Sequence, residues 1–172
     1  TPLTPAAIFL VATIDEGGEA VVNKALAGLS ALVRSVGFRT PLANLSLITG
    51  IGSAAWDRLF DAPRPAGLHE FVALDGGRHR APSTPGDLLF HIRGASMDVC
   101  FELGGRVLAA MAGAVTVVDE VHGFRFFEMR DLLGFVDGTA NPAGAELPDA
   151  TLITPDADPE FAGCSYVVVQ KY

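Results

Sequence analysis

Asp137 is the residue whose neighbours most favour chemistry. Residues 134–142 read Gly-Phe-Val-Asp-Gly-Thr-Ala-Asn-Pro, which places this single carboxylate beside glycines and two apolar side chains. Glycines let a backbone approach a flat ligand closely, and apolar neighbours tend to raise the pKa of a carboxyl group above about 3.9. Such a group could accept and return a proton. From spacing alone a plain turn is the better interpretation, since Asp-Gly and Asn-Pro are common turn dipeptides.

Other titratable side chains give weaker signals. Asp119 and Glu120 are adjacent in a predicted strand, so their side chains point to opposite faces and cannot converge on one substrate unless the strand bulges. The four histidines are interpreted as ordinary surface or strand residues, and we assign no metal ligand among His69, His79, His91 and His122. Cys100 and Cys164 lack the close spacing of a metal or redox pair, so both are expected to be small buried side chains.

The pattern of apolar residues predicts the elements that position this loop. Some segments alternate between apolar and polar residues or form apolar runs, as strands do, and two segments have the spacing of amphipathic helices. Their order is strand, helix, strand, then strand, helix, strand. The predicted strands are residues 7–13, 45–51, 88–93 and 114–121, and the predicted helices are residues 22–36 and 96–111. This order is typical of a ferredoxin-like α+β sandwich, an antiparallel β-sheet with two helices on one face. The other face is left for a ligand, a partner or more chain.

The last third of the sequence has less periodicity. Residues 123–163 are rich in Gly, Pro, Asp and Ala, and a loop of that length is usually functional or disordered. Residues 166–172 then alternate as a further strand would. We expect residues 1–172 to form a single ferredoxin-like domain, and the natural protein to continue beyond this strand.

Composition excludes several classes of function. Hydrophobic residues make up 49% of the 172 residues and charged residues 19%, which is typical of a globular domain. The net charge of -8 and the absence of any run of Lys or Arg argue against a nucleic-acid partner. Apolar runs such as residues 6–12 and 115–118 are too short to span a bilayer, and no signal peptide is evident. We expect a cytoplasmic protein without a membrane partner; a processed export signal stays open because the chain starts at Thr1.

The Asp137 loop also carries a family resemblance. Residues 134–142 closely resemble the G-x-x-D-G signature of dye-decolourising (DyP-type) heme peroxidases, in particular the bacterial P-type (B-class) branch, which commonly reads G-F-V-D-G-T-E-N-P. Further stretches resemble that branch in the same order along the chain, namely residues 7–11, 50–56, 86–93, 117–124 and 163–172. The resemblance covers essentially the whole chain, which is similar to the N-terminal half of such a peroxidase.

This resemblance implies a cofactor and a set of site residues. Family members have two ferredoxin-like domains and hold heme b through a proximal His and a distal Arg, which we assign to no residue here and expect in a C-terminal domain absent from this sequence. By resemblance Asp137 is the distal acid/base, and Gly138, Thr139 and Asn141 line the distal heme face. Asn141 is equally well explained as a cap of the turn. Ala140 departs from the family, where Glu is common, which changes the charge beside Asp137.

The function implied is a heme-dependent peroxidase that reduces hydrogen peroxide and oxidises dyes, phenols or similar small electron donors, with an acidic optimum. A homo-oligomer is expected, packaging in a protein shell is compatible with the family, and the N-terminal half alone should be inactive. The first alternative is a non-catalytic ferredoxin-like dimerisation or ligand-binding module. The second is a cofactor-independent or heme-degrading enzyme of the related dimeric α/β barrel group, for which none of the four histidines is convincingly placed.

Overall fold

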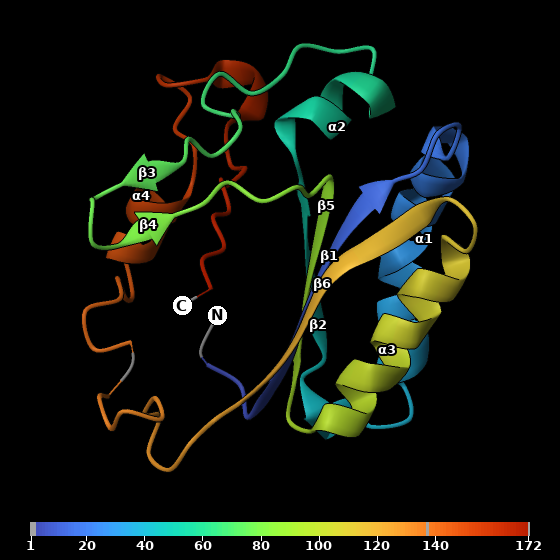
Figure 1. Cartoon of the computed structure of the whole chain (residues 1–172). Helices are drawn as coiled ribbons and strands as arrows, with labels where there is room; N and C mark the ends of the chain where they lie inside the picture. The colour runs from blue at the N-terminus through green and yellow to red at the C-terminus, as the bar shows by residue number, and fades with distance from the viewer. Residues whose placement is uncertain (1–2, 137, 172) are drawn as a thin grey trace.

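A computed structural model describes residues 3–136 and 138–171. Its main sheet contains β1 (Ala6–Ile14), β2 (Ser46–Ile51), β5 (Leu88–Gly94) and β6 (Val115–Phe124), in the order β2-β5-β1-β6 with every neighbouring pair antiparallel (Figure 1). The helices that connect these strands make this the ferredoxin-like order. The prediction of an antiparallel α+β sandwich is confirmed.

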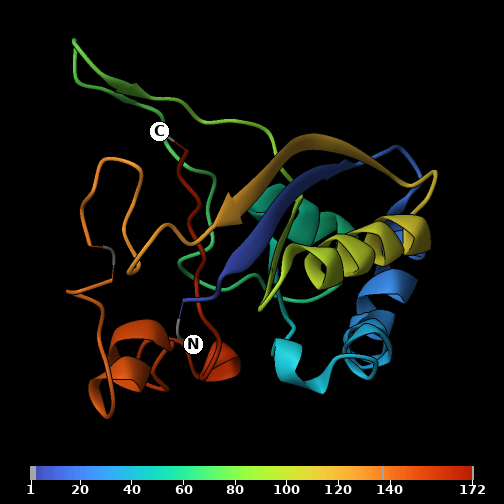
Figure 2. The same ribbon diagram turned by 90° about the horizontal axis from the view of Figure 1, so that it is seen from below.

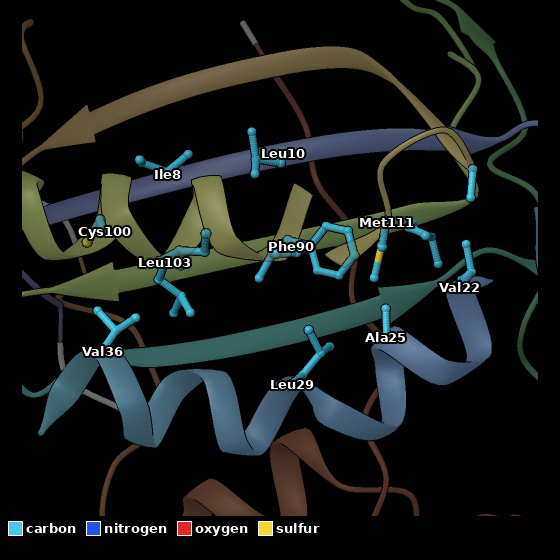
Figure 3. Close-up of a cluster of buried hydrophobic side chains, with 14 of the residues drawn as sticks. Ile8, Leu10, Val22, Ala25, Leu29, Val36, Phe90, Cys100, Leu103 and Met111 are labelled. Carbon is cyan, nitrogen blue, oxygen red and sulfur yellow. The ribbon is translucent and has the colours of Figure 1, made fainter. Parts of the chain in front are cut away.

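Two long helices cover one face of the sheet. These are α1 (Glu19–Gly37) and α3 (Met97–Ala110), and Figure 1 shows both on the same side. Every second residue of β1 and of β5 is buried, which directs one face of each strand into the core. Figure 3 shows how the buried helical positions meet this face, with Phe90 from β5 near the middle of the cluster. Cys100 belongs to this core, as predicted.

Short elements lie outside this two-layer core. They are the 3₁₀ turns η1 (Pro41–Ala43) and η2 (Pro159–Phe161), the helices α2 (Ser53–Leu59) and α4 (Glu146–Thr151), and the two-residue strands β3 (Leu74–Asp75) and β4 (Arg80–Ala81). Figures 1 and 2 show α4, β3 and β4 on the side of the sheet away from α1 and α3. In its described residues, the long loop predicted after residue 123 contains the short helix α4 and the 3₁₀ turn η2.

The strand predicted for residues 166–172 is wrong in the described part, because residues 166–171 adopt no strand conformation. A strand needs a neighbouring strand to satisfy its backbone groups, and none is paired with this segment in the described residues. Cys164, which was expected to be buried at the start of that strand, is exposed.

Arg58 connects three parts of the fold that are distant in sequence. Its guanidinium donates to Glu19 Oε1 at 2.6 Å and to the Ile14 carbonyl at 3.1 Å, and it lies 3.4 Å from Asp87 Oδ2. The same Asp87 oxygen accepts the Ile14 backbone N–H at 2.7 Å. These contacts join α2 to the β1–α1 turn and to the beginning of β5, so they fix one end of the sheet.

Candidate functional site

The candidate loop follows directly from β6. The Arg125 N–H donates to the Pro5 carbonyl at 2.9 Å, which extends the contact with the strand beside β6. Asp131 then organises the turn, because its Oδ1 accepts the backbone N–H groups of Leu133 at 2.9 Å and Phe135 at 3.0 Å. Arg130 donates to the Gly134 carbonyl at 2.7 Å. The segment that leads to residue 137 is therefore held by its own hydrogen bonds.

The proposed catalytic carboxylate, Asp137, lies outside the described residues. The residues after it form a turn in which the Asn141 N–H donates to the Gly138 carbonyl at 3.2 Å. Gly138 has a φ of 77°, and a Cβ added there would lie 3.2 Å from Asn141 Nδ2, so glycine fits this position best. Thr139 and Asn141 are exposed. Three of the predicted site residues are thus brought together in one turn, and the Asn141 side chain makes no hydrogen bond to any described residue.

Apolar side chains of this loop are directed away from the core. Leu132, Leu133 and Phe135 are each more than two-thirds exposed, and Val136 is also exposed. Exposed apolar side chains grouped in this way mark a surface that a ligand or another part of a protein covers. The expected apolar surroundings of Asp137 are therefore present in the sequence of the loop, but these side chains are not packed into the core.

A separate cavity lies on the sheet face opposite α1 and α3. It has a volume of about 910 Å³, and Ile48 of β2 and Tyr166 of the C-terminal segment contribute to its wall together with residues of α4. Most of the lining is apolar; the residues include Ala66, Gly67, Leu147, Ala150, Leu152, Ile153 and Asp158. None of the predicted site residues within the described ranges lines it. The structure therefore separates this cavity from the turn that contains Gly138.

The C-terminal segment closes one side of that cavity through specific contacts. Tyr166 Oη accepts the Gly67 N–H at 2.8 Å, and Asp158 Oδ2 accepts the Ala66 N–H at 3.0 Å. A Cβ on Gly67 would lie 2.8 Å from the Tyr166 ring, so a side chain there would displace the ring. Lys171 binds Asp119 at 2.7 Å, which ties the same segment to β6.

The sequence predicted that Asp119 and Glu120 do not converge on one site, and the structure agrees. Asp119 pairs with Lys171, whereas Glu120 Oε1 lies 2.6 Å from His122 Nε2. His69 contacts the neighbouring Glu70 carbonyl, and His79 is exposed. Within residues 3–136 and 138–171 no group of three or more His, Cys, Asp or Glu side chains is placed to hold a metal ion.

His91 is the histidine with the most distinct environment. Its ring stacks on Phe9 of β1 with centroids 4.1 Å apart and planes 14° apart. Burial, with a smaller contribution from the positive charge of Arg93, lowers the pKa of His91 from 6.5 to about 4. The ring is therefore neutral at neutral pH.

We expect stability to fall between pH 6.5 and pH 4 because of His91. The unfolded chain takes up a proton below pH 6.5 while the folded chain keeps the ring neutral, so this contribution is complete above that pH and is lost as the pH falls through about 4. The full shift corresponds to at most about 3 kcal/mol, and solvent screening of the half-buried ring reduces this to about 1–2 kcal/mol.

Denaturant unfolding of the full-length protein at pH 7 and pH 4.5 measures this effect. His91→Phe keeps a ring against Phe9 and should lessen the acid loss, whereas the matched exposed change His79→Phe should not. Equal acid sensitivity in both variants would contradict a buried neutral His91.

Comparison with known proteins decides the family. The model of the Dyp-type peroxidase N-terminal domain matches residues 1–125, and the C-terminal model of the same family matches residues 128–172. The chain belongs to the Dyp-type peroxidase family. The candidate loop lies in the part that the C-terminal model matches, and the ferredoxin-like core lies in the part that the N-terminal model matches.

The sequence of this Dyp-type chain is similar to those of its relatives along its whole length. It is 67% identical over 171 residues to a dye-decolorizing peroxidase of Mycolicibacterium paratuberculosis, covering 99% of this chain and 48% of the relative. It is 62% identical to the dye-decolorizing peroxidase of Rhodococcus erythropolis, covering 100% of this chain and 50% of that protein. The chain thus spans about half the length of the curated relatives it matches.

Solved structures support the same fold. The encapsulated DyP-type peroxidase from Mycobacterium smegmatis aligns with a TM-score of 0.92 at 66% identity, covering 95% of this chain and 52% of that chain. A variant of DypB from Rhodococcus jostii RHA1, solved in complex with heme, aligns with a TM-score of 0.91 at 47% identity, covering 95% of this chain and 53% of that one.

Proposed function

We propose that this chain forms part of a heme-dependent peroxidase that reduces hydrogen peroxide and oxidises dyes, phenols or similar small electron donors. The observation that carries the proposal is the turn around Gly138, which follows Asp137 in a chain belonging to the Dyp-type family. Relatives named as dye-decolorizing peroxidases, and a DypB variant solved with heme, support the same activity. In this proposal Asp137 is the acid/base, and Gly138, Thr139 and Asn141 line one face of heme b.

The described residues of the loop fit a flat apolar cofactor. Leu133 and Phe135 are exposed, and the space around Gly134, where a Cβ would meet no atom within 4 Å, is open. An exposed apolar rim with glycines lets a ring system approach the backbone closely. Heme, when bound, would supply the iron that takes up oxidising equivalents from peroxide. We assign no described residue as its axial ligand.

The chemistry proposed for this chain is the movement of one proton. Asp137 would take a proton from the oxygen atom of peroxide that is retained and return it to the oxygen atom that leaves as water. Asp131 and Arg130 would position this carboxylate, because their hydrogen bonds hold the segment before it. An acidic optimum for dye oxidation is part of this proposal.

Several properties of the whole protein are part of the proposal. The single-domain extent over residues 1–172 stays a prediction, as do the homo-oligomer and the inactivity of this half alone. The Mycobacterium smegmatis relative is described as encapsulated, which supports a cytoplasmic protein that is packaged in a shell. Within residues 3–136 and 138–171, none of the helices combines the length and the apolar character that a bilayer span requires.

Visible absorption of two proteins tests the proposal. The full-length protein, reconstituted with heme, should show a Soret band and decolourise a dye only when peroxide is present. The 172-residue chain alone should show neither. Stoichiometric heme binding by the short chain would instead assign a ligand among its own histidines, and a full-length protein without peroxide-dependent oxidation would overturn the proposed activity.

A further inference from the structure

Arg93 lies on the face of the sheet opposite α1 and α3. Residues of β5 alternate between buried and half-buried, and Arg93 is on the half-buried face together with His91. The strand registers place it between Ser46 of β2 and Ala7 of β1, with Gly123 of β6 beyond Ala7. Ser46 alone among these three neighbours has a polar side chain, so the row that contains Arg93 offers its guanidinium no carboxylate.

Two polar atoms in this row are buried without a partner. Arg93 Nε and Ser46 Oγ make no hydrogen bond to any atom within residues 3–136 and 138–171. In the same ranges no carboxylate forms an ion pair with Arg93, whereas Arg58 and Arg106 each have one. A buried guanidinium N–H or hydroxyl without a partner costs free energy, and folded proteins pair nearly all such groups. We therefore expect a group outside this part of the chain to bind here.

We propose that Arg93 and Ser46 bind the carboxylate of an Asp or Glu in the half of the protein that lies outside this chain. A guanidinium has donors and no acceptor, and its Nε–H and one Nη–H form a fork that matches the two oxygens of a carboxylate. The Ser46 hydroxyl can donate a further hydrogen bond to the same group. The site therefore requires a planar, negatively charged acceptor, and the proposal does not depend on the peroxidase activity.

Two observations favour the rest of the same protein as the source of this carboxylate. The chain spans 48% and 50% of two relatives, so a protein of their length contains about as much chain again. The sheet face that carries Arg93 also carries the cavity beside Ile48 and the C-terminal segment, where Val168 is 71% exposed (Figure 1). Apolar surface of this kind is covered by more protein. The net charge of -8 repels a free anion, whereas a carboxylate of the same protein is held at the site by the fold.

Cross-linking without a spacer identifies the partner in the full-length protein. Arg93→Lys keeps the positive charge and introduces an amine, which a carbodiimide joins to a carboxylate in direct contact. Peptide mapping by mass spectrometry should then link position 93 to an Asp or Glu outside residues 1–172. Arg106→Lys is the positive control, because Arg106 Nε lies 2.7 Å from Glu102 Oε1 and the variant should link to that residue. No link at position 93 beside a linked control, a link to a carboxylate within residues 1–172 or a link to a heme propionate would overturn the proposal.

Unfolding of variants of the full-length protein gives a second readout. Arg93→Met removes the charge at similar size and should lower the urea midpoint by about 0.5–1 M, because the carboxylate is left unpaired. Changing the linked carboxylate to its amide should also lower the midpoint, and the two changes together should cost less than their sum. Arg34→Met on the exposed side of α1 is the matched control and should shift the midpoint by less than about 0.2 M. Additive losses, or equal shifts for Arg93→Met and Arg34→Met, would mean that Arg93 has no such partner.

Discussion

Asp137→Asn slows peroxide-dependent dye oxidation by the full-length protein by about 10²–10⁴-fold, the range that a positioned acid/base contributes. Asparagine has nearly the shape of aspartate but cannot take up the proton from peroxide. The amide also has nearly the same size as the carboxylate, so we expect heme content and folding to stay unchanged. Stopped-flow measurement of peroxide consumption, with the Soret band as the measure of heme content, separates these two effects.

Asp149→Asn is the matched control for this prediction. Asp149 lies on α4, is exposed and has no proposed role in the site, so the same chemical change should alter turnover less than about twofold. If Asp137→Asn and Asp149→Asn had the same turnover as the original protein, Asp137 would be removed from the mechanism. If Asp137→Asn lost heme, the residue would instead have a structural role in cofactor binding.

The core of the fold could be predicted because its signal is local. The alternation in β5, with Leu88, Phe90 and Ile92 on one face, and the helical spacing of the buried residues of α1 indicate which side of each element is buried. Residues 166–171 show the limit of this signal. Their pattern also predicted a strand, but a strand forms only where a second strand binds its backbone, and a periodic pattern does not contain that information.

The site was predicted less completely for a similar reason. Asp137 is proposed from a contiguous motif, which one stretch of sequence displays in full, and its role stays a prediction. Asp131 was missed, although an Asp whose side chain accepts the backbone N–H two residues later is a recognisable local turn signal. Arg58 was missed because its partners Glu19 and Asp87 lie 39 and 29 residues away in sequence, and only the folded chain brings them together.

Asp87→Ala should lower the free energy of unfolding by about 2–3 kcal/mol. The substitution removes the acceptor of the Ile14 N–H, a donor on a partly buried strand, and an unsatisfied group of this kind costs about 1–3 kcal/mol. It also removes a carboxylate that is 16% exposed from the guanidinium of Arg58. Asp87→Asn retains an oxygen for the Ile14 N–H and loses only the charge, so it should cost about 1 kcal/mol or less.

Asp57→Ala is the matched comparison, because Asp57 also pairs with an arginine but is 59% exposed and, among residues 3–136 and 138–171, accepts no long-range backbone N–H. Such a surface ion pair contributes about 0–1 kcal/mol. Urea unfolding of the full-length protein should therefore show Asp87→Ala as the most destabilised variant, with Asp87→Asn and Asp57→Ala each losing about 1 kcal/mol or less. Equal loss in Asp87→Ala and Asp57→Ala would mean that the sheet end is held by packing alone. The predicted order would show that the backbone acceptor, more than the charge, makes Asp87 indispensable where β1 and β5 meet.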